Sequence, residues 1–422
     1  MSLLLASCQP AAEAPEEADV APEEPAVEEP AEKKLEIFSW WTAGGEAEGL
    51  YGMFDVYNEL YPDVEIINAT VAGGAGTNAK AVLATRLQGG DPPDSFQVHA
   101  GLEVEKYEPT TYLEPIDHMF DPKVFPQDLL DLLLYEGHYW TMPVNIHRSN
   151  VLWYNPKLLE ENNLAVPTTM KEFFEVCEAL EAAGLIPIAM GTKDGWEAAH
   201  VFESFLPSAL GADAYRGLWT GATSWNDPGV TQALEDFHTM MQYVNSDHAA
   251  LTWDSAGEYI IADKAVFMIM GDWAAGWFAS KGYGDFGWAP PPGTQGIFVG
   301  LSDAFALPKN APNHEQAVQW LEICGSKAGQ EAFNPAKGSI CARTDCDPAA
   351  FEVVPETYAY LISAAEDWAV DSIVPSVVHG AAAYESWATD FKDVLTLFVS
   401  SGDVAAAQSG LADLCVAAGI CN

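Results

Sequence analysis

Strand-like and helix-like patterns alternate over the first quarter of the chain, and this order limits the possible folds more than any other feature. Segments 35–39, 64–68 and 95–99 have the alternation or composition of strands. Two helix patterns separate them, with apolar positions at Leu50, Met53, Phe54, Tyr57 and Leu60 in the first and at Ala79, Val82, Leu83 and Leu87 in the second. A βαβαβ order predicts a sheet with helices on both faces.

A second set of α/β patterns follows. Thr168 or Thr169 is expected to cap a helix, and Asp227, followed by a proline, is expected to open another. A further helix pattern at 255–262 precedes the strand pattern 265–270. These segments predict a second α/β region with its own core.

Two strand-like segments, 139–155 and 303–307, fall where the pattern changes, and we predict that the chain crosses between two lobes there. Asn313 is expected to cap the helix that follows the second crossing. A length of 422 residues is sufficient for two domains. The predicted parts are an N-terminal segment of residues 1–34, an N-terminal α/β lobe of 35–144 and 302–346, and a C-terminal α/β lobe of 145–301 and 347–422.

The charge balance excludes some classes of partner. The chain has 62 acidic and 18 basic residues, a formal net charge of −44. Such a charge repels phosphate backbones and anionic lipids, so we expect no binding to nucleic acid. An excess of carboxylates also suits a protein that must stay hydrated at high salt, which suggests a saline habitat.

The N-terminus predicts an anchor and a tether. Leu5-Ala6-Ser7-Cys8 resembles the bacterial lipobox, whose cysteine is acylated after the signal peptide is cut. The apolar stretch before it is too short for a signal peptide, so we expect that the natural signal has been replaced. The following tract, to Lys34, is rich in Ala, Pro and Glu and cannot bury a core. We therefore expect an extracytoplasmic protein, lipid-anchored through Cys8, whose body has no membrane span.

The other six cysteines, an even number, fit an oxidising compartment. Cys341 and Cys346 could close one short loop, and Cys415 and Cys421 another. No histidine accompanies these cysteines at a spacing typical of zinc ligands, so we expect no metal.

Two strand ends carry the same combination of glycine, carboxylate and tryptophan. Trp40 and Trp41 end the first strand pattern, and a glycine-rich turn leads to Glu46 at the start of a helix. Asp272 and Trp273 follow the strand pattern 265–270 in the same way. Because α/β folds place ligands at strand ends, we expect both groups to face one cleft. A tryptophan at a strand end, taken alone, is more often part of the core.

Such a cleft could recognise a sugar. Carboxylates and amides pair with hydroxyls, Lys or His donates, and Trp covers the CH faces of a pyranose. The candidate ligand-binding residues are Trp40, Trp41, Glu46, Gln97, His99, Asn145, His147, Trp253, Trp273, Asp303, Lys337 and His379. Simpler roles compete for single members: Asp303 could cap a turn, and Lys337 could be a solvated loop residue.

Several blocks resemble a known family. GGDPPDSFQVHA at 89–100 and MGDWAAG at 270–276, together with segments 34–41, 143–150, 292–296, 333–339 and 378–381, are similar to the glucose/galactose-binding proteins of bacterial ABC sugar importers of the Thermus type. The blocks follow in the same order along the chain. The loop after Trp41 is one residue longer than the family pattern, and we expect Gly44 and Gly45 to take up the extra length.

The resemblance implies a class II periplasmic-binding-protein fold: two α/β lobes joined by crossing strands and a hinge. It implies a monomer without cofactor or catalytic residues that binds a monosaccharide and delivers it to the permease subunits in the membrane. Trp41, Trp253 and Trp273 would be aromatic walls. The hydroxyl partners would be Glu46, Gln97, His99, Asp303, Lys337 and His379.

Two alternatives stay open at this point. A secreted glycoside hydrolase would need two carboxyl groups across the scissile bond, and Glu46 and Asp303 could form such a pair. A binding protein for another solute, such as a disaccharide or betaine, is the second alternative, because a Trp-lined cage can hold a quaternary ammonium group. The positive charge of Lys337 and the two histidines argue against a cation.

Overall fold

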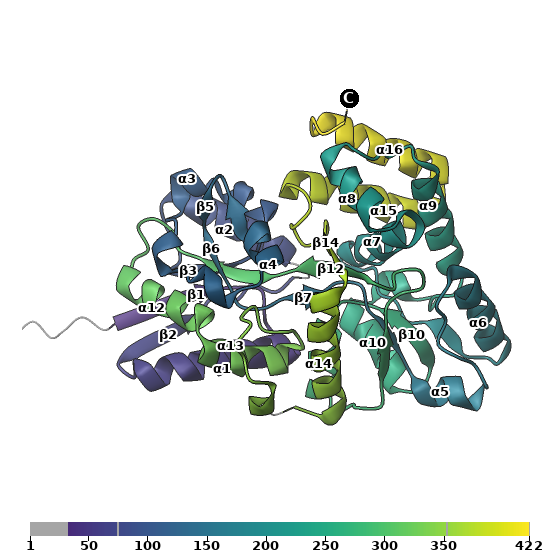
Figure 1. The fold of residues 1–422 in the computed structure, drawn as a ribbon, viewed down its shortest axis with the longest axis horizontal. Helices are drawn as coiled ribbons and strands as arrows, with labels where there is room; N and C mark the ends of the chain where they lie inside the picture. The colour runs from purple at the N-terminus through teal and green to yellow at the C-terminus, as the bar shows by residue number, and fades with distance from the viewer. Residues whose placement is uncertain (1–32, 74–75, 352, 422) are drawn as a thin grey trace, which may run out of the picture. The chain divides into compact units, whose positions relative to one another are not determined.

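The computed structural model describes residues 33–73, 76–351 and 353–421 (Figure 1). Cys8 lies outside the described residues, and so does the tether as far as Glu32. Gly74 lies outside them as well. The lipid anchor and the tether therefore stay predictions. The first described strand begins at Lys33, two residues before the strand segment that the sequence suggested.

A five-stranded mixed sheet contains the three strands predicted first. The order β2-β1-β3-β13-β6 joins β2 (Val64–Asn68), β1 (Lys33–Phe38), β3 (Ser95–His99), β13 (Asp303–Ala306) and β6 (Thr141–Pro143). β1 is parallel to both β2 and β3, whereas β13 is antiparallel to β3 and β6. The antiparallel register places Asp303 directly opposite His99, although 204 positions separate them along the chain.

Helices α1 (Gly44–Leu60) and α2 (Thr77–Gly89) have the predicted buried faces, with two corrections. Leu60 is 63% exposed, because it is the last residue of α1, and Val82 is 42% exposed. The buried face of α2 runs through Ala79, Lys80, Leu83 and Leu87, so Lys80 takes the place that periodicity gave to Val82. Gly90, in a left-handed conformation with a φ of 72°, ends α2.

Two further sheets lie in the second half of the fold. One has the order β11-β8-β10-β9, made of β11 (Gly287–Ala289), β8 (Leu152–Tyr154), β10 (Ala265–Ile269) and β9 (Ile186–Ile188). The other has the order β14-β12-β7, made of β14 (Ser372–Pro375), β12 (Ile297–Leu301) and β7 (His147–Arg148). A hairpin joins β4 (Leu134–Tyr135) to β5 (His138–Tyr139). In Figure 1, β7 and β12 run between the first sheet and the helices around β10.

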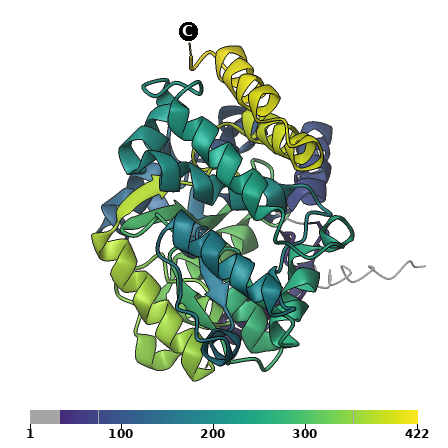
Figure 2. The same cartoon turned by 90° about the vertical axis from the view of Figure 1, so that its right-hand side faces the viewer.

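Helices cover these sheets. The others are α3 (Pro109–Tyr112), α4 (Gln127–Leu133), α5 (Pro156–Glu161), α6 (Met170–Ala182), α7 (Trp196–Leu210), α8 (Ala212–Thr220), α9 (Pro228–Met240), α10 (Trp253–Ile261), α11 (Trp273–Ser280), α12 (His314–Gly325), α13 (Lys327–Lys337), α14 (Pro355–Val370), α15 (Glu385–Ser401) and α16 (Val404–Ala417). Short 3₁₀ turns are η2 (Leu102–Tyr107), η3 (Asp117–Met119), η4 (Pro122–Val124), η5 (His248–Ala250) and η6 (Pro348–Ala350). Figure 2 shows the yellow C-terminal helices against the teal ones, and α15 packs on α7 and α16 on α9.

The chain crosses between the sheets where the pattern changes. Segment 139–155 is not one strand, because β6, β7 and β8 within it belong to three different sheets. On the return, only Ser302 separates β12 from β13, which again lie in different sheets. These crossings agree with the two-lobed α/β fold that we predicted. The residue limits of the two lobes stay predictions.

Side-chain caps fix two of the three helix starts that the sequence indicated. Thr169 forms a reciprocal capping box with Glu172 at the start of α6, and the carboxylate of Asp227 accepts from a backbone amide of α9. The expectation for Asn313 is wrong in its chemistry. Asn313 does precede α12, but its side chain and its backbone amide both donate to Asp94, so it ties α12 to the loop before β3.

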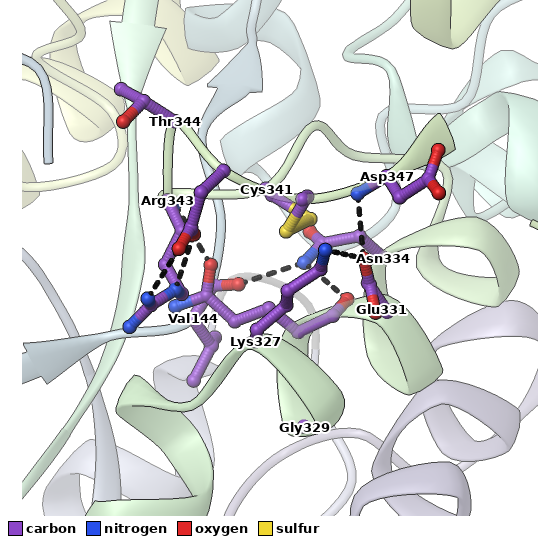
Figure 3. The surroundings of a disulfide bond; sticks show 12 residues. Val144, Lys327, Gly329, Glu331, Asn334, Cys341, Arg343, Thr344 and Asp347 are labelled. Atoms are coloured by element: carbon purple, nitrogen blue, oxygen red, sulfur yellow. Dashed lines mark hydrogen bonds and ion pairs between the residues drawn. A yellow bond between two sulfur atoms is a disulfide. The ribbon is translucent and has the colours of Figure 1, made fainter. Parts of the chain in front are cut away.

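Disulfides close both of the short loops that we considered. Cys341 is joined to Cys346, and Cys415 to Cys421, while Cys177 and Cys324 are free and buried. Figure 3 shows the first bridge beside the end of α13, where Asn334 donates to the carbonyl of Val144 over 2.9 Å. The bridge therefore lies next to a contact between α13 and the first crossing segment.

The described helices include none with the length and apolar character that a bilayer crossing requires.

The chain's charge predicts how its stability depends on salt. Because the chain has 62 acidic and only 18 basic residues, mutual repulsion among carboxylates destabilises the folded state at low ionic strength. We expect the Tm to rise by about 5 °C or more between 10 mM and 1 M NaCl, as screening shortens the range of repulsion. Calorimetry at several salt concentrations checks this, and a constant or falling Tm would contradict it.

Candidate functional site

A cavity of about 370 Å³ brings together all but two of the predicted ligand-binding residues. Its lining includes Trp40, Trp41, Glu46, His99, His147, Trp253, Trp273, Asp303, Lys337 and His379. Gln97 and Asn145 are buried beside it and bond to Asp303 instead. Trp41 and Trp273 share the cavity, since the Nζ atom of Lys337 lies 5.6 Å from the ring of the first and 5.7 Å from the ring of the second.

Asp303 is the centre of the polar contacts. It is the first residue of β13. Its carboxylate accepts a hydrogen bond from the side-chain amide of Gln97 at 3.1 Å and another from that of Asn145 at 2.9 Å. The Nε2 atom of His147 lies 3.2 Å from the same carboxylate. A carboxylate offers about four acceptor positions, so these contacts leave capacity for a ligand hydroxyl. A simple turn cap, the alternative role that the sequence left open for Asp303, does not account for these contacts.

Asp303 is ionised. Burial alone would raise the pKa of its carboxyl group, but the contact with His147 and the charge of Lys337 hold that pKa far below its ordinary value. The site therefore keeps a fixed negative charge, held by oriented donors, against one side of the cavity. Such a group accepts hydrogen bonds and cannot give up a proton.

Helices α1, α11 and α13 meet at the wall of the cavity because glycines allow them to approach. A Cβ atom on Gly45 in α1 would lie 2.1 Å from the carbonyl oxygen of Ala336 in α13, and one on Gly276 in α11 would lie 2.2 Å from it. A Cβ atom on Gly338 would lie 2.5 Å from the amide nitrogen of Gly276. No larger side chain fits at these positions without backbone movement. This packing brings Glu46, Trp273 and Lys337 together from three helices.

Lys337 is not the solvated loop residue that its local sequence suggested. It is the last residue of α13, it is only 3% exposed, and its Nζ atom lies 2.6 Å from Glu46 Oε1. The extra length of the loop after Trp41 does not remove Glu46 from the cavity, because Gly44 adopts a left-handed conformation with a φ of 59° and Gly45 packs closely against α13. The Glu46 and Lys337 charges therefore offset each other at the cavity wall.

Two histidines of the lining differ in their charge state. His147 is buried, which opposes protonation, but its contact with Asp272 raises its pKa. Burial lowers the pKa of His379 well below its ordinary value, and His379 Nε2 lies 3.2 Å from Nδ1 of His200. His147 is therefore suited to donate, and His379 is neutral.

Sequence reasoning missed part of the aromatic lining. Trp196 and Trp277 also face the cavity, with Thr42, Asp194, Asp254 and Lys281 near them in the lining. Trp277 lies one helical turn after Trp273 on α11, a spacing that could have indicated it. Trp196 follows Asp194 and Gly195 at the start of α7, the same combination of carboxylate, glycine and tryptophan that marked the other two sites.

The chemistry of this cavity is that of hydroxyl recognition. Aromatic rings line the cavity together with the ionised carboxylate of Asp303, the ion pair of Glu46 with Lys337, and histidine side chains. Within residues 33–73, 76–351 and 353–421, no group of three His, Cys, Asp or Glu side chains is placed to hold a metal ion. Stacking surfaces together with fixed donors and acceptors are suited to a polyol ring.

Comparison with known proteins gives the family. Residues 34–331 match the family described as bacterial extracellular solute-binding protein. An ABC transporter extracellular-binding protein of Pyrococcus horikoshii is 35% identical over 380 residues, 88% of this chain and 85% of its own. A protein of Brucella suis described as a probable sugar-binding periplasmic protein is 31% identical, over 76% of this chain and 77% of its own.

A solved structure shows the same fold. The bacterial solute receptor AcbH, whose description states an exclusive preference for β-D-galactopyranose, superposes with a TM-score of 0.79 at 18% identity, over 92% of this chain and 99% of its own. The match of most of the chain to the family and the shared fold lead to one conclusion: this chain is a member of the bacterial extracellular solute-binding proteins.

Proposed function

We propose that this protein is the extracytoplasmic sugar-binding component of an ABC importer, that it binds a monosaccharide, glucose or galactose, and that it delivers the sugar to the permease. The observation that carries the proposal is the cavity itself, in which Trp41 and Trp273 flank polar groups centred on Asp303. The relatives described as sugar-binding proteins support it. We further propose a monomer anchored through Cys8, which is not an enzyme.

The size of the cavity favours a small ligand. Ligand pockets range from about 300 to 1,000 Å³, and this one, at about 370 Å³, is near the lower limit. A single sugar ring is therefore a better fit than an oligosaccharide.

The charges favour a neutral ligand. The opposite charges of Glu46 and Lys337 offset each other. The carboxylate of Asp303 accepts from two side-chain amides and contacts His147. A quaternary ammonium solute such as betaine would have to approach the buried ammonium of Lys337. A sugar instead pairs its hydroxyls with all of these groups and leaves no charge unmatched.

The same contacts disfavour hydrolysis. A glycosidase needs one carboxyl group whose pKa is raised so that it can protonate the leaving oxygen. The pKa of Asp303 is lowered, and Glu46 is bonded to Lys337. The pair considered in the sequence therefore lacks a proton donor, and we propose binding without turnover.

Binding would close the two proposed lobes, 35–144 with 302–346 and 145–301 with 347–422, around the ligand. The crossing strands β7, β12 and β13 carry His147 and Asp303 at the junction of the sheets, so a ligand bonded to these residues and to Glu46 contacts elements from different sheets. A ligand that makes more contacts in the closed arrangement shifts the population toward it.

Calorimetry against glucose, galactose, mannose, a disaccharide and betaine tests the proposed function. Stoichiometric binding of a hexose, with no chemical change in the sugar, is the expected result. Release of a reducing sugar from a glycoside would favour the hydrolase, and preferential binding of betaine or of the disaccharide would replace the proposed ligand.

Trp273→Ala is expected to weaken hexose binding by roughly 1 to 3 kcal/mol, because an indole face and its apolar contact with the sugar are lost. Trp288→Ala is the matched control, since Trp288 is a partly buried indole on β11 that is not part of the cavity lining. Titration calorimetry of both variants measures the difference. Equal affinities for the Trp273 variant and the unchanged protein would remove Trp273 from the site.

A further inference from the structure

A buried ionic network lies directly behind the cavity. Glu103 in η2 is fully buried, and its Oε2 atom lies 2.6 Å from Nδ1 of His99 and 2.7 Å from Nζ of Lys80. The same Lys80 Nζ lies 3.2 Å from Oε2 of Glu385 at the start of α15. Among these residues only His99 reaches the cavity lining.

The network controls which nitrogen of His99 carries a proton. Burial opposes ionisation of Glu103, but the charge of Lys80 and the contact with His99 lower its pKa to about 2. An ionised carboxylate only accepts hydrogen bonds, so Nδ1 of His99 must donate to it. The other nitrogen, Nε2, is then turned away from Glu103 and lies 3.8 Å from Asp303 Oδ1 in the cavity.

Lys80 has a separate task. Its ammonium group lies against the same carboxylate oxygen that contacts His99. Lys80 keeps Glu103 ionised, and Glu385, 305 positions further along the chain, holds Lys80 in place. Buried ion pairs add little to stability because desolvation offsets their attraction, so stability alone does not explain this network.

We propose that Glu103 is a positioning residue for ligand binding: it fixes the tautomer and the ring orientation of His99 so that Nε2 is presented to a sugar hydroxyl, and Lys80 keeps Glu103 in the ionised form that this requires. The inference rests on the proposed sugar-binding function and names a residue that lies outside the cavity lining. Fixing one nitrogen of an imidazole through a hydrogen bond to the other is a general way to orient histidine.

The test uses the full chain and a double variant, Lys80→Met with Glu103→Leu, which removes both charges together, while Glu385 keeps its contact with Lys106 at 3.8 Å. Calorimetry measures affinity for the hexose that the unchanged protein binds best. Long-range ¹H–¹⁵N spectra, with signals assigned by His99→Asn, report the tautomer of His99. We expect roughly tenfold weaker binding and a loss of the fixed Nδ1–H form. Glu385→Gln is the matched control, because the glutamine side chain keeps an oxygen that can accept from Lys80 and leaves the contacts among Lys80, Glu103 and His99 in place, and it should bind within about twofold of the unchanged protein.

The outcomes separate cleanly. A folded double variant with unchanged affinity, or with an unchanged His99 tautomer, overturns the proposal. Glu103→Gln, which keeps the side-chain shape, replaces the double variant if that variant does not fold, and roughly threefold weaker binding is expected from it. If the unchanged protein binds no sugar, the proposed function fails, and the tautomer spectra alone then decide whether Glu103 orients His99.

Discussion

Replacing Asp303 with alanine is expected to weaken hexose binding about a hundredfold or more, the largest effect on affinity that the structure predicts. The carboxylate is ionised, and hydrogen bonds to a charged acceptor are stronger than those between neutral groups. Its loss removes an acceptor from the ligand. It also takes the acceptor from the side-chain amide of Gln97 and one of two acceptors, the other being Ser339, from the side-chain amide of Asn145. A cost of about 3 kcal/mol corresponds to this change in Kd.

The measurement needs a check on folding, because the backbone amide of Asp303 is also bonded to Asn145, and β13 pairs with β3 at this point. Circular dichroism and Tm values show whether the variant retains its fold. The matched control is Asp254→Ala, which removes a carboxylate from the lining at a partly exposed position near the start of α10. The idea that Asp303 is the central acceptor fails if a folded Asp303→Ala protein binds hexose within threefold of the unchanged one.

Much of the fold could be predicted because its signals are local. Period-two alternation marked β1, and apolar spacing of three and four residues marked α1. Thr169 and Asp227 indicated where two helices begin, because their side chains are of the kind that caps a helix. The cavity residues beside Trp41 and Trp273 followed from the rule that α/β folds place ligands at strand ends.

The rest could not be predicted, because it depends on segments that are distant in the sequence. Lys337 looks like a loop lysine in its local sequence, and only the packing of α1, α11 and α13 buries it. Lys80 falls on a helix face where periodicity favoured an apolar residue, and its partners Glu103 and Glu385 lie 23 and 305 positions away. A buried charge leaves no periodic signal, since its partner can stand anywhere in the chain.

The second large effect is on stability: Glu197→Gln is expected to stabilise the protein at pH 8 by roughly 2 to 3 kcal/mol. Glu197, in the first turn of α7, is fully buried, and the backbone amides of residues 194, 195 and 197 near its carboxyl group do not offset the cost of that burial. Burial raises its pKa from 4.5 to about 7. Because the folded-state pKa exceeds the unfolded-state pKa, the group favours folding below about pH 4.5, and this contribution is lost as the pH rises toward and beyond 7.

Glutamine has nearly the shape of the protonated carboxyl group and has no proton to lose, so its advantage should appear only where Glu197 would be ionised. Urea unfolding midpoints at pH 5 and pH 8 therefore separate this mechanism from a general packing effect. Glu178→Gln on the exposed face of α6 is the control, because it changes the net charge by the same amount without any burial. A stability gain that is equal at both pH values would show that charge burial at Glu197 is not its cause, since only an ionisation cost grows with pH.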